Sequence, residues 1–254
     1  MNDWFLSAFQ VRRGDAVSIV GSGGKVTLMY RFSHEALELG YTVVTTASTH
    51  IHPPNARQSH GLIVADETPD WLSDLPGTLA SRRHVTIVGE RPRSDKLRGL
   101  DADVLDRLRS VCPIDLMLVK ADGARTRSFK APGDHEPAVP SWTTHCVIVA
   151  GLQSVGLPLN EKHVHRIERV MALTGLQPDE PLTPEAIGRV VSHPEAYIRS
   201  IPDGARISVY LGWCSGEERR RNAEKIADHV DMRHISQVFC GAIEKDGATL
   251  VQLR

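Results

Sequence analysis

Segments with strand-like and with helix-like patterns of hydrophobic residues alternate along the first 150 residues of the chain. Short apolar runs rich in β-branched residues predict buried strands, and between them Thr27–Leu39 and Asp103–Val111 repeat apolar positions at helical spacing. Such alternation is typical of an α/β fold with a mainly parallel sheet and helices on both faces, whose ligands bind at the carboxyl ends of the strands. The predicted strands are Val17–Val20, Thr42–Thr46, Leu62–Ala65, Val85–Gly89, Leu116–Lys120, Cys146–Ala150 and Ile207–Leu211.

After about residue 155 the pattern becomes helical. We predict helices at Glu161–Leu173 and Pro184–Val191, the second capped by Thr183. They form a small helical insert, about 155–200, within a single domain that spans 1–254. Near the end, Ile235–Ile243 and Ala248–Leu253 predict a hairpin closed by the Asp-Gly of Glu244-Lys-Asp-Gly247.

The first strand leads into a glycine-rich turn with a lysine and then into a helix. Glycines at these positions let backbone N–H groups approach an anion, and the helix start adds the positive end of its dipole. We expect a phosphate-binding loop and a three-layer fold like that of phosphate-loop NTPases. A glycine-rich turn without any ligand is the alternative. The loop consists of Gly21, Ser22, Gly23, Gly24, Lys25, Val26 and Thr27.

This loop departs from the common pattern G-x-x-x-x-G-K-[ST]. Ile19 stands where that pattern has its first glycine, and Val26 stands where it has a hydroxyl that ligates Mg²⁺. The only nearby hydroxyl is that of Thr27. The sequence therefore predicts phosphate binding by Lys25 with a weakened metal site.

A second motif, Leu116-Met-Leu-Val-Lys-Ala-Asp-Gly-Ala-Arg125, delivers an aspartate at the end of an apolar strand. Asp122 is where a phosphate-loop protein places the carboxylate that orients its metal, so we take Lys25 and Asp122 as candidate catalytic residues and Thr27 and Asp122 as candidate metal ligands. Lys120 should point to the same side as Asp122. The alternative for Asp122 is an ordinary turn residue before a glycine. For Arg125 the two alternatives are a side chain that clamps an anion and one that lies on the surface.

Three further segments carry polar residues suited to a site. Residues 45–54 hold four hydroxyls with His50 and His52, and residues 128–140 concentrate charged groups in a proline-rich loop. His163 and His165 fall in a predicted helix, where their side chains would point roughly 160° apart, so phosphate contact or hydrogen bonding is favoured over a metal pair.

Composition narrows the class of protein. A net charge of −1 over 254 residues gives no broad footprint for nucleic acid or an acidic membrane, and the cluster Arg219–Arg221 is better explained as a solvated helix face. The four cysteines form no CxxC pair and are typical of thiols in a reducing compartment. We expect no secretory signal and no membrane helix, and hence a cytoplasmic protein.

Four motifs together resemble the YqeC family, accessory proteins of selenium-dependent molybdenum hydroxylases. They are VGSGGKVTLM, TTASTHIHPP, LVKADGARTRSFKAPGDHEPAVP and VAGLQSVGLPLNEKHVHR, and they span about residues 15–195. The resemblance implies a cytoplasmic protein that binds a nucleoside triphosphate, ATP or GTP, with or without Mg²⁺, and helps to mature a molybdenum hydroxylase. Its partners would be that hydroxylase or its cofactor-maturation proteins.

Carried onto this sequence, the resemblance nominates a set of site residues beyond the loop and Asp122. Family members read G-G-K-T-T and E-A-D-G-A where this chain has Val26 and Lys120, and many carry an N-K-x-D-like segment where this chain has Leu211-Gly-Trp-Cys-Ser-Gly216. An NTPase is therefore one hypothesis, with a Mur-type ligase or transferase less favoured; a carrier or sensor of nucleotide or molybdopterin phosphate without turnover is the other. The candidate binding residues are Thr46, Gly123, Arg125, Lys130, His135, Glu136, His163, His165 and Arg166.

Overall fold

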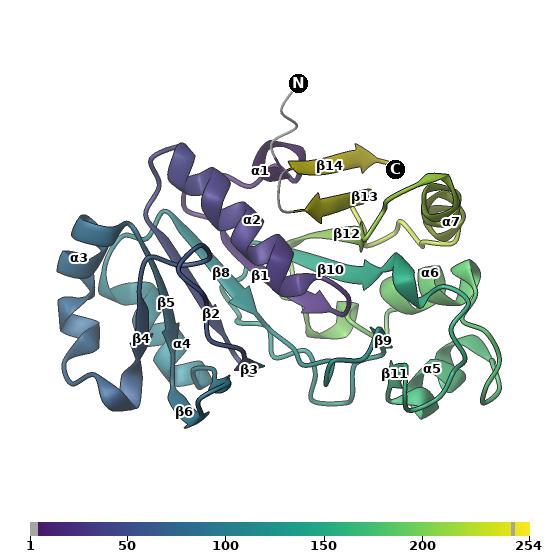
Figure 1. Ribbon diagram of the computed structural model, residues 1–254, viewed down its shortest axis with the longest axis horizontal. Helices are drawn as coiled ribbons and strands as arrows, with labels where there is room; N and C mark the ends of the chain where they lie inside the picture. The colour runs from purple at the N-terminus through teal and green to yellow at the C-terminus, as the bar shows by residue number, and fades with distance from the viewer. Residues whose placement is uncertain (1–4, 245–246) are drawn as a thin grey trace.

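A nine-stranded sheet forms the centre of the computed structural model, which describes residues 5–244 and 247–254 (Figure 1). Its order is β14-β13-β12-β10-β1-β8-β2-β5-β4, and every pair is parallel except β13 with β14. The mainly parallel α/β fold predicted from the sequence is thus confirmed. The strands are β1 (Ala16–Gly21), β2 (Val43–Ala47), β4 (Leu62–Val64), β5 (His84–Val88), β8 (Leu116–Lys120), β10 (His145–Gly151), β12 (Arg206–Gly212), β13 (Gln237–Glu244) and β14 (Gly247–Gln252).

Helices cover both faces of this sheet. On one face α1 (Phe5–Ala8) packs on α2 (Lys25–Glu38), which lies over β1, β2 and β8. The other face is covered at one end by α3 (Trp71–Arg82) and α4 (Ala102–Val111), and at the other by α6 (Pro184–Ser192) and α7 (Glu217–Asp228). Strand alternation explains this, since Val17 and Ile19 join the α2 core while Ala16 and Val20 face the opposite helices.

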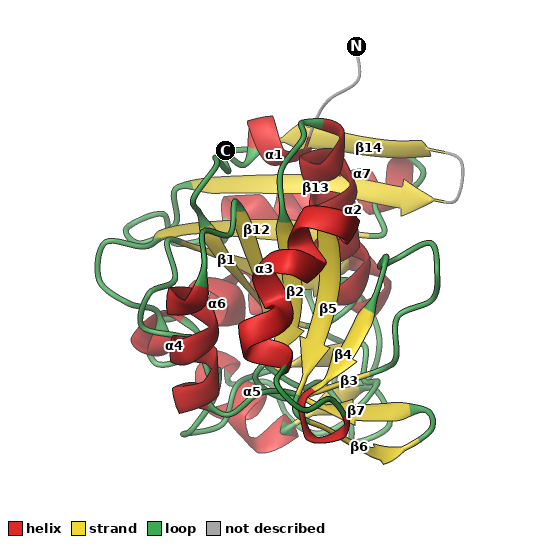
Figure 2. Cartoon of the chain, turned by 90° about the vertical axis from the view of Figure 1, so that its left-hand side faces the viewer, coloured by secondary structure: helices red, strands yellow, loops and turns green. Residues whose placement is uncertain are grey.

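Two smaller sheets lie outside the central one. The strands β3 (His50–Ile51), β7 (Lys96–Arg98) and β6 (Glu90–Arg93) form an antiparallel sheet that follows the carboxyl ends of β2 and β5 (Figure 2). The short strands β9 (Phe129–Lys130) and β11 (Val164–His165) pair in parallel, just before α5 (Ile167–Thr174). Neither sheet was predicted, because each consists of strands too short to leave a periodic signal.

The predicted helix Glu161–Leu173 is wrong in its first half. His163 directly precedes the extended strand β11, His165 lies in it, and α5 begins only at Ile167. The cause is a long-range backbone pairing, in which the N–H of Phe129 donates to the carbonyl of His163 at 3.2 Å. The argument that a helix separates the two histidines therefore does not hold.

The other predicted elements agree with the structure within a few residues. Thr183 caps α6, since its hydroxyl oxygen accepts a hydrogen bond from the N–H of Ala186 at 3.1 Å. Arg220 and Arg221 lie on the surface of α7 and form ion pairs with Glu224 and Glu217, one helical turn away. The hairpin strands are confirmed, while Asp246 of its turn and residues 1–4 lie outside the described residues. The helices α1 and α3 were not predicted from the sequence. Among the described residues, no helix is long and apolar enough to cross a membrane.

The end of β1 generates a stability prediction. Gly21 has φ +96°, and a Cβ built there would lie 2.1 Å from the carbonyl oxygen of Val149, whereas Gly14 has φ +93° with nothing within 4 Å. Gly14→Ala should therefore cost only the left-handed strain, about 1 kcal/mol of the free energy of unfolding. Gly21→Ala should cost at least about 3 kcal/mol, since β10 backbone must also move. Denaturant unfolding of both variants checks this; equal losses would contradict it.

Candidate functional site

The glycine-rich loop joins the buried end of β1 to the start of α2. Gly21, Gly23 and Gly24 have φ of 96°, 80° and 129°, conformations that L side chains rarely adopt. A Cβ built on Gly23 would lie 2.7 Å from backbone atoms of Gly151, so only glycine allows this contact with β10. No side chain caps α2 at Gly24, so the first backbone N–H groups of the helix have no side-chain acceptor, as at helix starts that bind anions.

Lys25, the first residue of α2, turns back under the loop. Its ammonium lies 2.7 Å from Asp122 Oδ1 and also donates to the carbonyl of Gly21. Asp122 is fully buried and accepts the N–H of Gly21 at 2.9 Å on Oδ2. Burial lowers the pKa of Lys25, and the charge of Asp122 opposes that shift.

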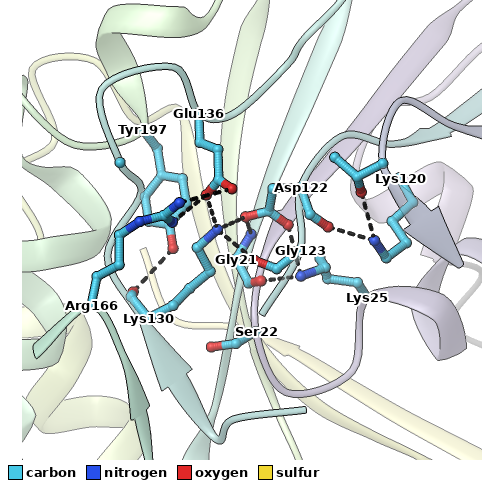
Figure 3. Close-up of polar contacts among 12 residues, drawn as sticks. Gly21, Ser22, Lys25, Lys120, Asp122, Gly123, Lys130, Glu136, Arg166 and Tyr197 are labelled. Carbon is cyan, nitrogen blue, oxygen red and sulfur yellow. Dashed lines mark hydrogen bonds and ion pairs between the residues drawn. The ribbon is translucent and has the colours of Figure 1, made fainter. Parts of the chain in front are cut away.

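A second lysine approaches Asp122 from the opposite side (Figure 3). Lys130 Nζ, which is fully buried, lies 3.0 Å from Asp122 Oδ2 and 2.7 Å from both Glu136 Oε2 and the carbonyl of Gly123. Arg166 closes the chain with hydrogen bonds of 2.6 and 3.2 Å to Glu136. The result is a row of alternating charges that runs from the loop to the start of α5.

The two carboxylates of this row are held ionised. Burial by itself raises the pKa of Asp122, but Lys25 and Lys130 outweigh it and the net shift is downward. Burial likewise opposes ionisation of Glu136, yet hydrogen bonds from Arg166 and Lys130 lower its pKa to about 2. Both acids are therefore anions at neutral pH.

Lys120 occupies a separate position beside this row, at the end of β8. Its ammonium donates to the Thr49 hydroxyl at 3.0 Å and to the carbonyls of His50 and Asp122 at 2.8 and 2.5 Å. Burial, followed by the charge of Lys25, lowers its pKa to about 7. Lys120 was predicted to point to the same side as Asp122, and its ammonium meets the backbone carbonyl of Asp122, while the carboxylate pairs with Lys25 and Lys130.

These groups border a pocket of about 1240 Å³ at the carboxyl edge of the sheet. Seven lysine and arginine side chains line it, whereas Glu136 is the single carboxylate among the described lining residues. The pKa of two lining histidines is also lowered, first by burial and then by neighbouring cations. Lys96 and Lys120 contribute to the shift of His50, and Arg166 and Lys130 contribute to that of His165. The pocket therefore favours anions. Its basic residues are Lys25, Arg93, Lys96, Lys120, Arg125, Arg127 and Arg166.

Most of the residues predicted for the site come together here. Gly21, Ser22, Asp122 and Lys130 are buried beneath the pocket, where Ser22 donates its hydroxyl to the Ser128 carbonyl at 3.2 Å. The predicted residues that line the pocket are Gly23, Gly24, Lys25, Val26, Thr27, Gly123, Arg125, Glu136, His165 and Arg166.

Three predicted residues lie elsewhere. Thr46 is buried in β2 and donates to the carbonyl of Ile87 at 2.7 Å. His135 is exposed, His163 is partly buried, and neither lines the pocket. They neighbour site residues in sequence, but the strand β2 and the turns around β9 and β11 direct them away.

Several residues of the pocket were not predicted from the sequence. Gln153 follows β10 and Trp213 follows β12, and both lie in segments compared with the family without a role for these two side chains. Arg93 and Lys96 come from the β6–β7 sheet, which carries no motif. Only knowledge of the strand order would have placed them beside the loop.

The residues proposed to bind Mg²⁺ do not fit that ion in this arrangement. Both oxygens of Asp122 contact lysine ammonium groups, and Thr27 is an exposed residue of α2. Within 5–244 and 247–254, no group of three His, Cys, Asp or Glu side chains is arranged to hold a metal ion. Mg²⁺ prefers carboxylate oxygens in octahedral geometry, and the structure offers it ammonium groups instead.

The buried ammonium of Lys120 generates a pH prediction. Folding lowers its pKa from 10.5 to about 7, so between these values the unfolded chain binds more protons and stability rises with pH. The free energy of unfolding of the wild type, minus that of Lys120→Met, should increase by about 1 kcal/mol per pH unit between about pH 7.5 and 9. Denaturant unfolding of both proteins at several pH values measures this difference. If the free energies of unfolding of the two proteins changed in parallel with pH, the prediction would be wrong.

Comparison with known proteins agrees with the resemblance of the motifs. The family model described as YqeC protein matches residues 17–168, a range that contains the loop, Asp122 and Arg166. The uncharacterized protein YqeC of Escherichia coli (strain K12) is 26% identical over 237 residues, which cover 93% of this chain and 91% of that relative. The chain therefore belongs to the YqeC family.

Proposed function

We propose that this protein binds a nucleoside triphosphate, with its phosphates on the loop from Gly21 to Thr27. One observation carries the proposal: Lys25 is held under a glycine loop at the edge of a pocket lined by basic residues. Free backbone N–H groups, a helix start and a mobile ammonium are the components of a phosphate site. A turn without ligand would not explain a concentration of cations around a single carboxylate.

The charge row supports a defined step on binding. Lys25 leaves Asp122 and the Gly21 carbonyl and turns its ammonium to the phosphates. Asp122 does not become an unpaired buried anion, since Lys130 remains 3.0 Å from it and its bond from Gly21 N–H persists. A buried carboxylate stripped of every partner would cost several kcal/mol, and the second lysine avoids that cost.

The same arrangement favours binding over rapid turnover. Val26 replaces the hydroxyl that would ligate Mg²⁺, and Lys130 still pairs with Asp122 after Lys25 has turned to the phosphates. A carrier or sensor of nucleotide, or of a molybdopterin-type phosphate, is thus a second candidate function, distinguished from an NTPase by the absence of phosphate release. In either case the family resemblance supports a role in maturing a molybdenum hydroxylase, with that enzyme or its maturation proteins as partner.

Loss of the Lys25 ammonium tests the proposal directly. Calorimetric titration of the wild type with ATP, GTP and CTP should give binding whose affinity changes by less than about threefold between Mg²⁺ and chelator. Lys25→Met should weaken it at least about 100-fold, the effect expected for losing a charge-assisted contact of roughly 3 kcal/mol. Lys162→Met, at an exposed lysine outside the pocket, serves as the matched control. Equal affinity of the two variants would refute the phosphate site.

A gain of function tests the second candidate. Val26→Thr combined with Lys120→Glu restores a hydroxyl and an acid at the two positions where this chain departs from its family pattern. Steady-state phosphate release should be close to background in the wild type and become Mg²⁺-dependent in the double variant, rising about tenfold or more. Rapid release by the wild type would reject the carrier hypothesis, and an unchanged double variant would reject this explanation of the slow rate.

A further inference from the structure

Trp213 stands beside the phosphate loop at the end of β12. A Cβ built on Gly212 would lie 3.1 Å from the carbonyl oxygen of Gly23, so a glycine at 212 lets the end of β12 approach the loop closely. The next residue, Trp213, lines the pocket, and its indole Nε1 lies 3.9 Å from a Cβ built on Gly24. The indole is thus adjacent to the loop that would hold the phosphates.

The indole is exposed although its backbone is firmly held. Trp213 is 55% exposed, in a chain whose other tryptophans described by the structure are more buried. Its φ of +64° is left-handed, which is unfavourable for an aromatic residue. Its carbonyl nevertheless accepts from Arg219 Nη1 at 3.1 Å and from Ser215 N at 3.0 Å, while Cys214 N donates to Gly241 at 2.9 Å. These bonds hold a large apolar surface in solvent at the pocket.

Gln153 provides an independent observation on the other side of the loop. Its Nε2 atom lies 3.0 Å from a Cβ built on Gly23, and Gln153 lines the same pocket. The Oε1 atom lies 2.2 Å from a Cβ built on Gly151, is buried, and has no hydrogen-bond partner among the described residues. The amide therefore faces the loop with its N–H donors. Gln153 and Trp213 thus flank consecutive glycines with a hydrogen-bond donor and an aromatic face.

We propose that Trp213 stacks on the base of the bound nucleotide. This inference rests on the proposed nucleotide site. Stacking uses the π-face that every base shares. Trp213 lies in the segment Leu211–Gly216, where many family members carry an N-K-x-D-like sequence, the familiar reader of guanine. The site should consequently select weakly among bases, with ATP, GTP and CTP differing by less than about tenfold in affinity and the purines binding better.

Two ligands separate stacking from phosphate binding. Calorimetry compares ATP with inorganic tripolyphosphate, which has no base, on the wild type, Trp213→Ala and Trp213→Phe. Trp213→Ala should bind ATP about tenfold more weakly and tripolyphosphate within about twofold of the wild type, and Trp213→Phe should recover most of the loss. Unchanged ATP affinity in Trp213→Ala, or an equal loss for both ligands, would overturn the stacking. A wild type that binds neither ligand would instead overturn the proposed function itself.

Tryptophan fluorescence gives a second readout that a general loss of structure would not imitate. ATP should quench the emission of the wild type and tripolyphosphate should not. The quench should persist in Trp142→Phe, a control at an indole that donates to Asp106 at 2.7 Å and does not line the pocket, and disappear in Trp213→Phe. A quench retained by Trp213→Phe would place the base elsewhere.

Discussion

The ion pairs of the buried Asp122 carboxylate determine how the site is built. Leaving this group unpaired in the protein interior would cost several kcal/mol, so its partners are fixed by the same free energy that folds the chain. They come from different elements: Gly21 N–H ends β1, Lys25 begins α2, and Lys130 lies in β9. One carboxylate thereby couples the glycine loop, the helix that follows it, and the loop after β8.

The charge row also explains why the segment between β10 and β12 is tied to the sheet edge. Glu136 bonds both Lys130 and Arg166, and Arg166 directly precedes α5. The row contains three cations and two carboxylates, an excess of one positive charge. If Lys25 turns to an anionic ligand, the four remaining groups balance one another. The excess charge is thus located at the loop, where a ligand can reach it.

The sequence predicted those parts of the fold that depend on local pattern. Leu116–Lys120 matches β8 at both ends because its apolar run is bounded by polar residues, and Thr183 specifies the start of α6 through its own hydroxyl. The pairing of β9 with β11 depends on residues more than thirty positions apart, so periodicity assigned the first half of that region to a helix. Arg93 and Trp213 reach the pocket only through sheet order, which a single sequence does not encode locally.

Lys120 shows how a cation here differs from a metal. The three oxygens that it contacts belong to a hydroxyl and two backbone carbonyls, and none of them carries a full negative charge. With a pKa of about 7, Lys120 carries about half a positive charge at neutral pH, and a bound polyanion would favour its protonated form. An ammonium does not bridge two phosphate oxygens in octahedral geometry, however, and it activates no coordinated water. A lysine in place of an acid thus favours a polyanion while removing support for hydrolysis, which is the balance expected of the proposed nucleotide carrier.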